Sequence, residues 1–359
     1  MMKPYLYSLL GASLVLTSCK DQKDEAAATP EAAKSFQFEM TNAYTLKVPE
    51  GAQSVKAWFA MPQRDEASQK IAEFKVDCQY PHEIVKDQFG NEFVSINLTN
   101  PPAGDLQLTE TFKVVRTEIK VDADPAKVDE SAEGVDAKYL EENVNIVITP
   151  EIAAEAKKVV GDEKNPVIAA RKLYDWTLEN IDYWVKDPAN KKASGIGSST
   201  YTFETKTGNC TDFHSLWVAM ARSQGISSRL VYGSIPKPTL DGKDADQSYH
   251  CWPEFHAKGI GWIPHDVAVA DLYHDEFPLT EENKSGVELT SAVGYQGKDD
   301  KMVDYYFGNI DERRVTWNRG RDHVLEGASG VIDSLPKAHV EIDGKPVADW
   351  TRKLTYKSL

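Results

Sequence analysis

The sequence predicts an α+β protein, in which strands and helices occupy separate stretches of the chain. Apolar residues alternate with other residues from Phe36 to about Val121, which is typical of half-buried strands. Between Thr149 and Gly225 the apolar residues recur at helical spacing instead. Further strand-like segments follow from Ser228 onwards. A β-rich first part, a helical middle and a β-rich end are therefore expected.

The composition indicates a folded protein of more than one domain. The chain has 359 residues, of which 41% are apolar and 27% charged, enough for two or three cores and too apolar for bulk disorder. Its 41 basic and 56 acidic residues give a net charge of −15, which argues against nucleic acid or an anionic membrane surface as the main partner. No apolar run has the length of a transmembrane helix.

The N-terminus has the features of an export signal. Lys3 supplies a positive charge, and Tyr5 to Leu16 is an almost uncharged apolar segment that is too short to span a bilayer. The segment runs into Leu-Thr-Ser-Cys, which resembles a bacterial lipobox, so residues 1–18 are expected to be removed and Cys19 to carry a lipid. This predicts a lipid anchor to a bacterial membrane and a place in the cell envelope, on its periplasmic or cell-surface side. An ordinary secretory signal with an incidental cysteine is the alternative.

Residues 19–35 and 36–125 are expected to form a tether and a β-sandwich domain. The first stretch is charged and rich in alanine, as solvated linkers are. The second holds six to eight short strand-like segments, and Phe89 to Phe93 is typical of a hairpin turn. Since it does not concentrate catalytic residue types, it is expected to support or present a substrate. An acidic linker over residues 122–138 follows.

The helical middle contains clear start and stop signals. Thr149 before a proline predicts a helix start, and Gly161 can end that helix. Asn165, also before a proline, predicts a second start. Residues 186–206 are rich in Lys, Ala, Gly, Ser and Thr and are expected to form a long loop, a feature that usually has a functional reason.

A third helix is expected over residues 207–225, with Asn209 as its cap and Gly225 at its end. Cys210 would lie in its first turn, where unpaired backbone N–H groups and the positive end of the dipole lower a thiol pKa. A lone cysteine is more often a small buried apolar residue. To act as a nucleophile, Cys210 needs a histidine to share its proton and a third group to orient that histidine.

A hairpin further along the chain offers both partners. Its first strand carries His250, and its second strand, expected over residues 261–268, carries Asp266. A three-residue turn that pairs Ala257 with Gly261 would bring the two side chains to one face as diagonal neighbours. A two-residue or four-residue turn would place them on opposite faces.

Three motifs occur in order in this region. Residues 207–216 are Thr-Gly-Asn-Cys-Thr-Asp-Phe-His-Ser-Leu, residues 249–255 contain His-x-Trp-x-Glu, and residues 261–266 are Gly-Trp-Ile-Pro-His-Asp. With these spacings they resemble the motifs of bacterial transglutaminase-like proteins. The resemblance covers roughly residues 139–275 and implies a papain-like α+β core, preceded by the β-sandwich and followed by a β-rich segment.

The resemblance also implies the roles of a catalytic triad. Cys210 would be the nucleophile, His250 the acid and base, and Asp266 the group that orients the histidine. Cys251 and Pro253 depart from the alanine and aliphatic residues that are commoner in the family. A proline cannot donate a ladder hydrogen bond, so an edge or a bulge is expected there.

The implied reaction is acyl transfer on a protein or peptide substrate, without a cofactor. The Cys210 thiolate attacks a carboxamide or peptide carbonyl, the departing amine takes a proton, and a thioester remains. Water then gives hydrolysis, as in a protease or amidase, whereas a lysine amine gives cross-linking. Hydrolysis is favoured because water is abundant in the envelope. The backbone N–H of Cys210 is expected to supply one oxyanion donor, and Tyr183 or Trp184 the second.

The remaining cysteines and histidines have simpler interpretations. Cys78 and Cys251 are expected in the core, with a disulfide between them as the alternative, and Cys251 should point away from His250. His214, one turn after Cys210, is expected to pack or to act as a rival base. No metal site is expected, because the available ligands lack HExxH or paired CxxC spacing. Those ligands are Cys210, His214, His250, His256 and His265.

The last segment, residues 276–359, is expected to be a β-rich extension, with Asp343-Gly344 as a hairpin turn. Together with the sandwich, it makes a large β-rich flank without chemistry of its own. This flank motivates a second hypothesis, a non-catalytic envelope lipoprotein that keeps the fold in order to bind peptides. The complete Cys/His/Asp set argues against it, because a binding module need not retain all three.

Overall fold

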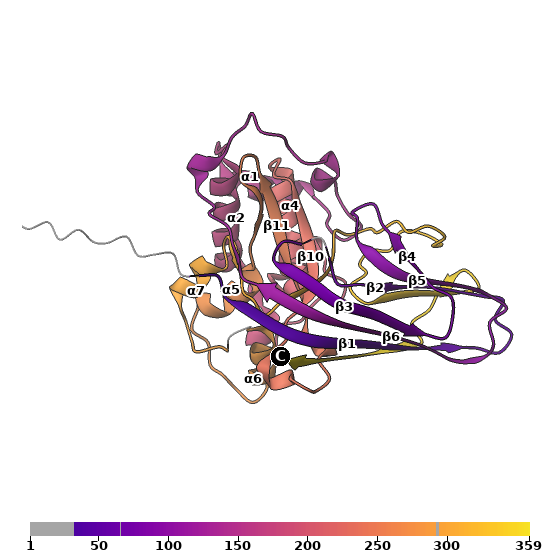
Figure 1. Cartoon of the computed structure of the whole chain (residues 1–359). Helices are drawn as coiled ribbons and strands as arrows, with labels where there is room; N and C mark the ends of the chain where they lie inside the picture. The colour runs from indigo at the N-terminus through magenta and orange to yellow at the C-terminus, as the bar shows by residue number, and fades with distance from the viewer. Residues whose placement is uncertain (1–31, 65, 292–293) are drawn as a thin grey trace, which may run out of the picture. The chain divides into compact units, whose positions relative to one another are not determined.

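The alternating apolar residues of the N-terminal part form two antiparallel sheets (Figure 1). The structure, a computed structural model, describes residues 32–64, 66–291 and 294–359. The expected signal peptide, Cys19 and most of the expected tether lie outside the described residues. Ala33–Leu359 pack as one compact unit.

The two sheets make a sandwich. Their strand orders are β17-β1-β6-β3 and β16-β15-β2-β5-β4. Leu46, Phe59 and Ile96 are among the side chains buried between them. The strands are β1 (Ser35–Val48), β2 (Ser54–Ala60), β3 (Gln69–Cys78), β4 (Glu83–Lys86), β5 (Glu92–Thr99), β6 (Gly104–Thr117), β15 (Ala338–Ile342), β16 (Lys345–Pro346) and β17 (Trp350–Ser358). The β-sandwich predicted from the alternation is confirmed.

Strands from the C-terminal segment complete both sheets. β17 pairs with β1, and β15 pairs with β2, so the backbone groups along one side of β1 and of β2 are satisfied by the end of the chain. The alternation predicts such strands but not their partners. The predicted domain boundaries at residues 125, 139 and 275 stay a prediction. The expected hairpin turn at Asp343-Gly344 is confirmed, because Ile342 pairs with Lys345 and both turn residues have positive φ.

The helical middle follows the predicted caps. The side chains of Thr149 and Asn165 accept hydrogen bonds from the first turns of α1 and α2, and α1 ends at Gly161. The stretch predicted as a loop over residues 186–206 contains a short helix, α3, capped by Ser198, so that prediction was wrong in part. The helices are α1 (Pro150–Val160), α2 (Pro166–Asn180), α3 (Ser199–Thr205), α4 (Cys210–Ser223), α5 (Val267–His274), α6 (Lys284–Thr290) and α7 (Asp300–Tyr305).

A third sheet lies against α4, which is buried along almost its whole length (Figure 1). Its strand order is β12-β11-β10-β14, with antiparallel pairing throughout. These strands are β10 (Ser228–Ser234), β11 (Tyr249–Ala257), β12 (Gly261–Pro264) and β14 (Val315–Arg319). The shorter strands are β7 (Ile119–Lys120), which pairs with β13 (Asn309–Ile310), and β8 (Asp182–Tyr183), which pairs with β9 (Thr207–Gly208).

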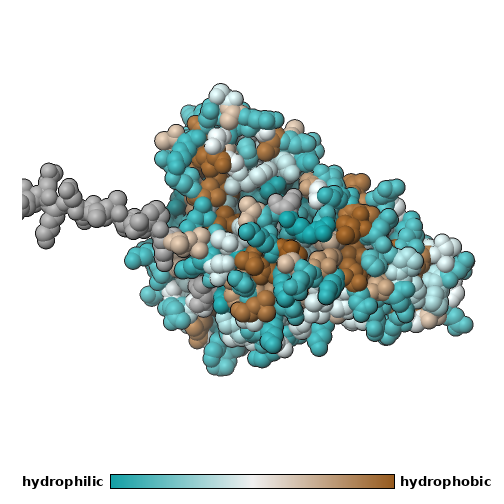
Figure 2. All heavy atoms as spheres, in the orientation of Figure 1, coloured by the Kyte–Doolittle hydropathy of each residue, from teal (hydrophilic) through white to brown (hydrophobic). Residues whose placement is uncertain are grey.

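The surface is largely polar. On the face seen in Figure 2 hydrophilic residues predominate, and apolar residues gather in separate groups. Within residues 32–359, leaving aside positions 65 and 292–293, every helix is too short or too polar to cross a membrane.

Candidate active site

The first turn of α4 is held by a reciprocal cap. The Asn209 side chain accepts hydrogen bonds from the backbone N–H groups of Thr211 (2.9 Å) and Asp212 (3.1 Å), and Asp212 accepts one from the backbone N–H of Asn209 (3.0 Å). Cys210 is thus the first residue of the helix, as predicted, and its side chain is only 4% exposed. The buried Asp212 also accepts the backbone N–H groups of Ser194 and Ser198, which ties the preceding segment to the same helix end.

The expected hairpin brings His250 and Asp266 together. Ala257 pairs with Gly261 across a three-residue turn, so the register required by the parity argument is confirmed. The prediction of a second strand over residues 261–268 was wrong beyond Pro264, because β12 ends there. Asp266 instead caps α5, and its Oδ2 accepts a hydrogen bond from His250 Nε2 at 2.8 Å.

The end of β12 also explains how Pro253 is tolerated. The last β11–β12 pair is Glu254 with Pro264, so Pro253 lies one residue beyond the paired stretch. The ladder on that side of β11 has therefore ended at Pro253, which needs no donor there, although the Pro253 carbonyl still accepts the backbone N–H of His265 at 3.1 Å.

Cys210 and His250 form a buried acid–base pair. The two side chains hydrogen-bond, and because Nε2 of His250 faces Asp266, Nδ1 is the ring nitrogen left for the sulfur. A hydrogen bond from the Cys251 thiol, followed by the charge of His250, holds the pKa of Cys210 well below its ordinary value despite burial. Burial of the His250 ring opposes its protonation, but Asp266 and the Cys210 thiolate raise its pKa to about 8. Near neutral pH the arrangement favours thiolate and imidazolium.

Arg314 is a charged neighbour that the sequence did not reveal. Its guanidinium is wholly buried and donates to Asp266 Oδ2 at 2.7 Å. Its other side pairs with Asp311 Oδ2 at 2.8 Å. Burial opposes ionisation of Asp266, but His250 and Arg314 hold the pKa of that carboxyl well below its usual range. The pattern Asp-x-x-Arg just before β14 is the one local signal of this pair.

His214 lies behind the pair rather than in place of His250. Its Nε2 lies 3.4 Å from the backbone nitrogen of Ala268 and 3.5 Å from Asp266 Oδ1, and its Nδ1 lies 3.4 Å from Cys251 Sγ. Burial lowers the pKa of His214, so the ring is neutral near pH 7. Of the two expected roles, packing fits this position.

The other cysteines are free thiols. Cys251 is fully buried in the same apolar cluster as Cys210, as expected of a core residue, whereas Cys78 packs against the sandwich core. Among the described residues, Cys78, Cys210 and Cys251 form no disulfide, so the alternative pairing of Cys78 with Cys251 is absent.

The two residues expected to support an oxyanion lie at the end of β8. The Tyr183 hydroxyl hydrogen-bonds to Thr290, so it is already engaged. Trp184 is half-buried and packs against the core around Cys210. The assignment of the second oxyanion donor stays a prediction.

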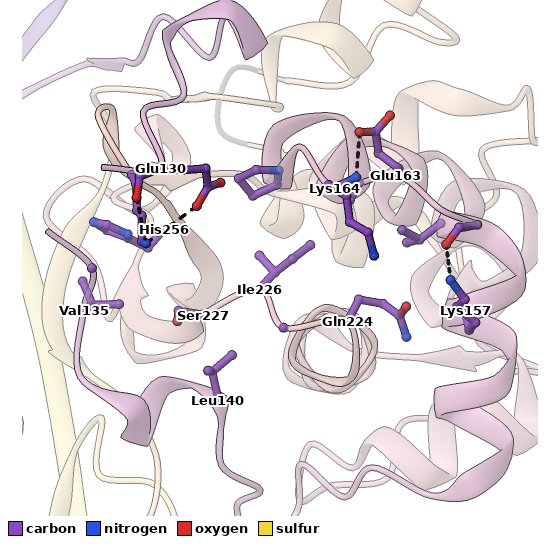
Figure 3. A pocket seen from close by; sticks show the side chains of 17 residues that line it. Glu130, Val135, Leu140, Lys157, Glu163, Lys164, Gln224, Ile226, Ser227 and His256 are labelled. Carbon is purple, nitrogen blue, oxygen red and sulfur yellow. Dashed lines mark hydrogen bonds and ion pairs between the residues drawn. The ribbon is translucent and has the colours of Figure 1, made fainter. Parts of the chain in front are cut away.

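A hollow of about 610 Å³ is lined by sequence neighbours of the pair, though not by Cys210 or His250 themselves. Its lining includes Asn209 and Thr211, which flank Cys210, and Tyr249, which precedes His250. A second hollow, of about 430 Å³, lies at the other end of α4 and is lined by Gln224, Ile226 and other residues (Figure 3). In the part of the chain that the structure describes, no three His, Cys, Asp or Glu side chains are grouped to hold a metal ion.

Comparisons with known proteins identify the region that contains the site. Residues 153–267 match the family model described as the transglutaminase-like superfamily. An uncharacterized protein of Haemophilus influenzae is 24% identical over 350 residues, which are 88% of each chain.

A solved structure gives the same fold. A candidate cysteine protease from Cytophaga hutchinsonii is 16% identical, covers 90% of this chain and 98% of its own, and has a TM-score of 0.53. The periplasmic domain of TgpA from Pseudomonas aeruginosa is a weaker match, 15% identical over 66% of this chain and 90% of its own, with a TM-score of 0.33. The predicted α+β fold is confirmed, and residues 153–267, which contain Cys210, His250 and Asp266, form a domain of the transglutaminase-like superfamily.

Proposed function

We propose that this protein is a cysteine hydrolase that cleaves peptide or glutamine amide bonds through a thioester on Cys210. The observation that carries the proposal is the buried hydrogen-bonded series Cys210, His250, Asp266. A thiolate next to an imidazolium is the pair that nucleophilic catalysis by cysteine needs, and the carboxylate keeps the ring in one orientation.

The first half-reaction forms the thioester. The Cys210 sulfur attacks the carbonyl carbon, and the carbonyl oxygen becomes an oxyanion that the backbone N–H of Cys210 can stabilise. His250 then gives its proton to the amine, the C–N bond breaks, and the amine leaves. We assign the second oxyanion donor to Trp184 rather than Tyr183, because the Tyr183 hydroxyl is engaged with Thr290.

The second half-reaction decides between hydrolysis and cross-linking. His250, now neutral, takes a proton from water, which attacks the thioester and releases a carboxylic acid and the Cys210 thiol. A lysine amine in place of water would give an isopeptide bond. We favour water, because it is abundant in the envelope compartment that the N-terminal sequence predicts.

A protein or peptide is the proposed substrate, and the hollow beside Asn209, Thr211 and Tyr249 is the proposed place for it. We also propose that Cys19 is lipidated and tethers the enzyme to a bacterial membrane, with its catalytic domain in the periplasm or at the cell surface. Intact mass of the mature N-terminus tests this anchor. A diacylglyceryl group on Cys19 supports it, and an unmodified Cys19 or cleavage elsewhere contradicts it.

One observation favours the alternative of a non-catalytic peptide-binding lipoprotein. Cys210 and His250 are only 4% and 3% exposed, so little of either residue reaches solvent. Catalysis requires the substrate to reach the sulfur, whereas a binding module does not.

Amide hydrolysis by wild type and Cys210→Ser separates the two functions. The measurement is release of amine or ammonia from a library of glutamine-containing peptides, with Cys78→Ser as the matched control, because Cys78 is a free thiol in the sandwich. The enzyme reading predicts that only Cys210→Ser loses turnover. Peptide binding without turnover in all three proteins would establish the alternative.

A further inference from the structure

The Cys251 thiol lies close to the candidate nucleophile and takes no covalent part in the proposed reaction. The Cys251 thiol donates to Thr211 Oγ1 at 3.5 Å, and the same hydroxyl lies 3.9 Å from Cys210 Sγ. The two thiols influence each other, because Cys251 lowers the pKa of Cys210 and Cys210 raises the pKa of Cys251. They come from the start of α4 and the middle of the sheet, so the contact joins two elements that pack closely.

Burial, then the neighbouring Cys210 thiolate, holds the pKa of Cys251 well above its ordinary value, so its sulfur stays protonated until a base takes the proton. Nε2 of His214 lies 3.4 Å from the backbone nitrogen of Ala268 and 3.5 Å from Asp266 Oδ1, while its Nδ1 lies 3.4 Å from Cys251 Sγ. With the ring proton on Nδ1, the ring stabilises negative charge as it develops on the sulfur; with the proton on Nε2, Nδ1 can accept the proton of the Cys251 thiol. Both cysteines lie in one buried apolar cluster, so a product formed on one sulfur stays in contact with the other.

We propose that Cys210 and Cys251 form a peroxide-sensitive pair, in which oxidation of Cys210 by a hydroperoxide ends in a Cys210–Cys251 disulfide that reversibly blocks the nucleophile. This regulation rests on the proposed function, because it matters to activity only if Cys210 is the nucleophile.

The chemistry balances in two steps. The Cys210 thiolate attacks one peroxide oxygen, an S–O bond forms, the O–O bond breaks, and the leaving hydroxide takes a proton from solvent to become water. Cys251 then attacks the Cys210 sulfur, the S–S bond forms, the S–O bond breaks, and the Cys251 proton leaves with the hydroxyl as water. The two sulfurs lose two electrons in total, which reduce one hydroperoxide. A small dithiol reverses the change by exchange.

The test uses the full mature chain and reads masses rather than turnover. Wild type, Cys251→Ser, Cys251→Ala and the control Cys78→Ser are each treated with one equivalent of hydrogen peroxide and mapped as peptides without reduction. Wild type and Cys78→Ser should lose the free thiols of Cys210 and Cys251 and gain one linked peptide pair. Dithiothreitol should then restore alkylation of Cys210.

The Cys251 variants should behave differently, because they lack the second thiol. Their Cys210 should be trapped by dimedone as a sulfenic acid and, left untrapped, should progress to a sulfinic acid that dithiothreitol does not restore. The proposal is overturned if wild type gives no linked pair, or if wild type and Cys251→Ala lose Cys210 alkylation to the same irreversible extent. If the linked pair forms but the protein hydrolyses no amide, the proposed hydrolase function is contradicted and the proposed redox pair is supported.

Discussion

The two ends of α4 differ in kind, although each adjoins a hollow. At the N-terminal end Cys210, His250 and Asp266 are buried and bonded to one another. At the C-terminal end, beyond Gln224, the hollow is lined by several charged side chains that reach solvent, such as Lys157 and Lys164 (Figure 3).

The charged side chains at the C-terminal end of α4 stay hydrated or form ion pairs with nearby residues. Lys157 pairs with Asp162, and Lys258 lies 3.6 Å from Glu130. Burial, then the positive charges of Arg229 and Lys258, lowers the pKa of His256, the histidine of β11 that lines this hollow, so it is neutral near pH 7. A hollow alone therefore does not indicate a reactive site. A reactive site is indicated by buried titratable groups that have shifted pKa values and a fixed orientation.

The largest effect should come from the carboxylate at the N-terminal end. Asp266→Asn keeps the size of the side chain but no longer holds His250 in the same tautomer, so we expect kcat/KM for amide hydrolysis to fall about 10³–10⁴-fold. Glu163→Gln, which changes a carboxylate of the other hollow in the same way, should leave the rate near that of wild type. Equal losses in the two variants would remove the distinction between the two ends.

Arg314 should matter more for stability than any surface arginine. Arg314→Met leaves the buried carboxylates of Asp266 and Asp311 without their shared cation, so we expect a loss of about 3–5 kcal/mol in the free energy of unfolding. Arg171→Met is the matched control, because Arg171 also bridges two carboxylates, Asp175 and Asp304, but in partly exposed positions. Its loss should be below about 1 kcal/mol. Urea unfolding measures both, and a similar loss for both would contradict the buried network.

Arg314 also shows where sequence reasoning stopped. The helix caps and the hairpin turn are local, so Asn209 and the Ala257–Gly261 pairing could be predicted from neighbouring residues. The Arg314–Asp266 contact joins residues 48 positions apart in different elements, and no periodicity carries that information. The pairing of β17 with β1 could not be predicted either, because it depends on which side of β1 has backbone groups without a partner strand.

One further difference, at α3, has a local cause, whereas the contact of Cys251 with Cys210 depends on tertiary packing. α3 is made mostly of Ser, Thr and aromatic residues, which favour helices weakly, yet Ser198 caps it and Asp212 anchors that cap from α4. Cys251 was correctly expected in the core, but alternation along β11 gives only its direction. The Cys210 sulfur lies next to Cys251 because α4 packs on this sheet, and the alternation along β11 does not predict that packing.

The pH profile should distinguish two histidines on one strand. His250 has a pKa of about 8 and must be protonated to release the amine, so kcat/KM should fall about tenfold from pH 7 to pH 9 as the imidazolium is lost. Alkylation of Cys210 should not fall over that range, because the thiolate persists. His256→Gln, at the opposite end of β11, should leave both profiles unchanged. A profile that moves with His256 rather than with His250→Gln would reverse the assignment.

The smallest expected effect compares the two helix ends directly. Asn209→Ala removes the cap of α4, so we expect a loss of about 1 kcal/mol in the free energy of unfolding. Because the first-turn N–H groups then lose their fixed geometry around Cys210, the pH midpoint of its alkylation should also move upwards. Gln224→Ala, at the C-terminal cap, should change stability by less than about 0.5 kcal/mol and leave the midpoint in place. A midpoint that stays put in Asn209→Ala would mean that the neighbours Cys251 and His250, not the helix end, set the ionisation of the sulfur.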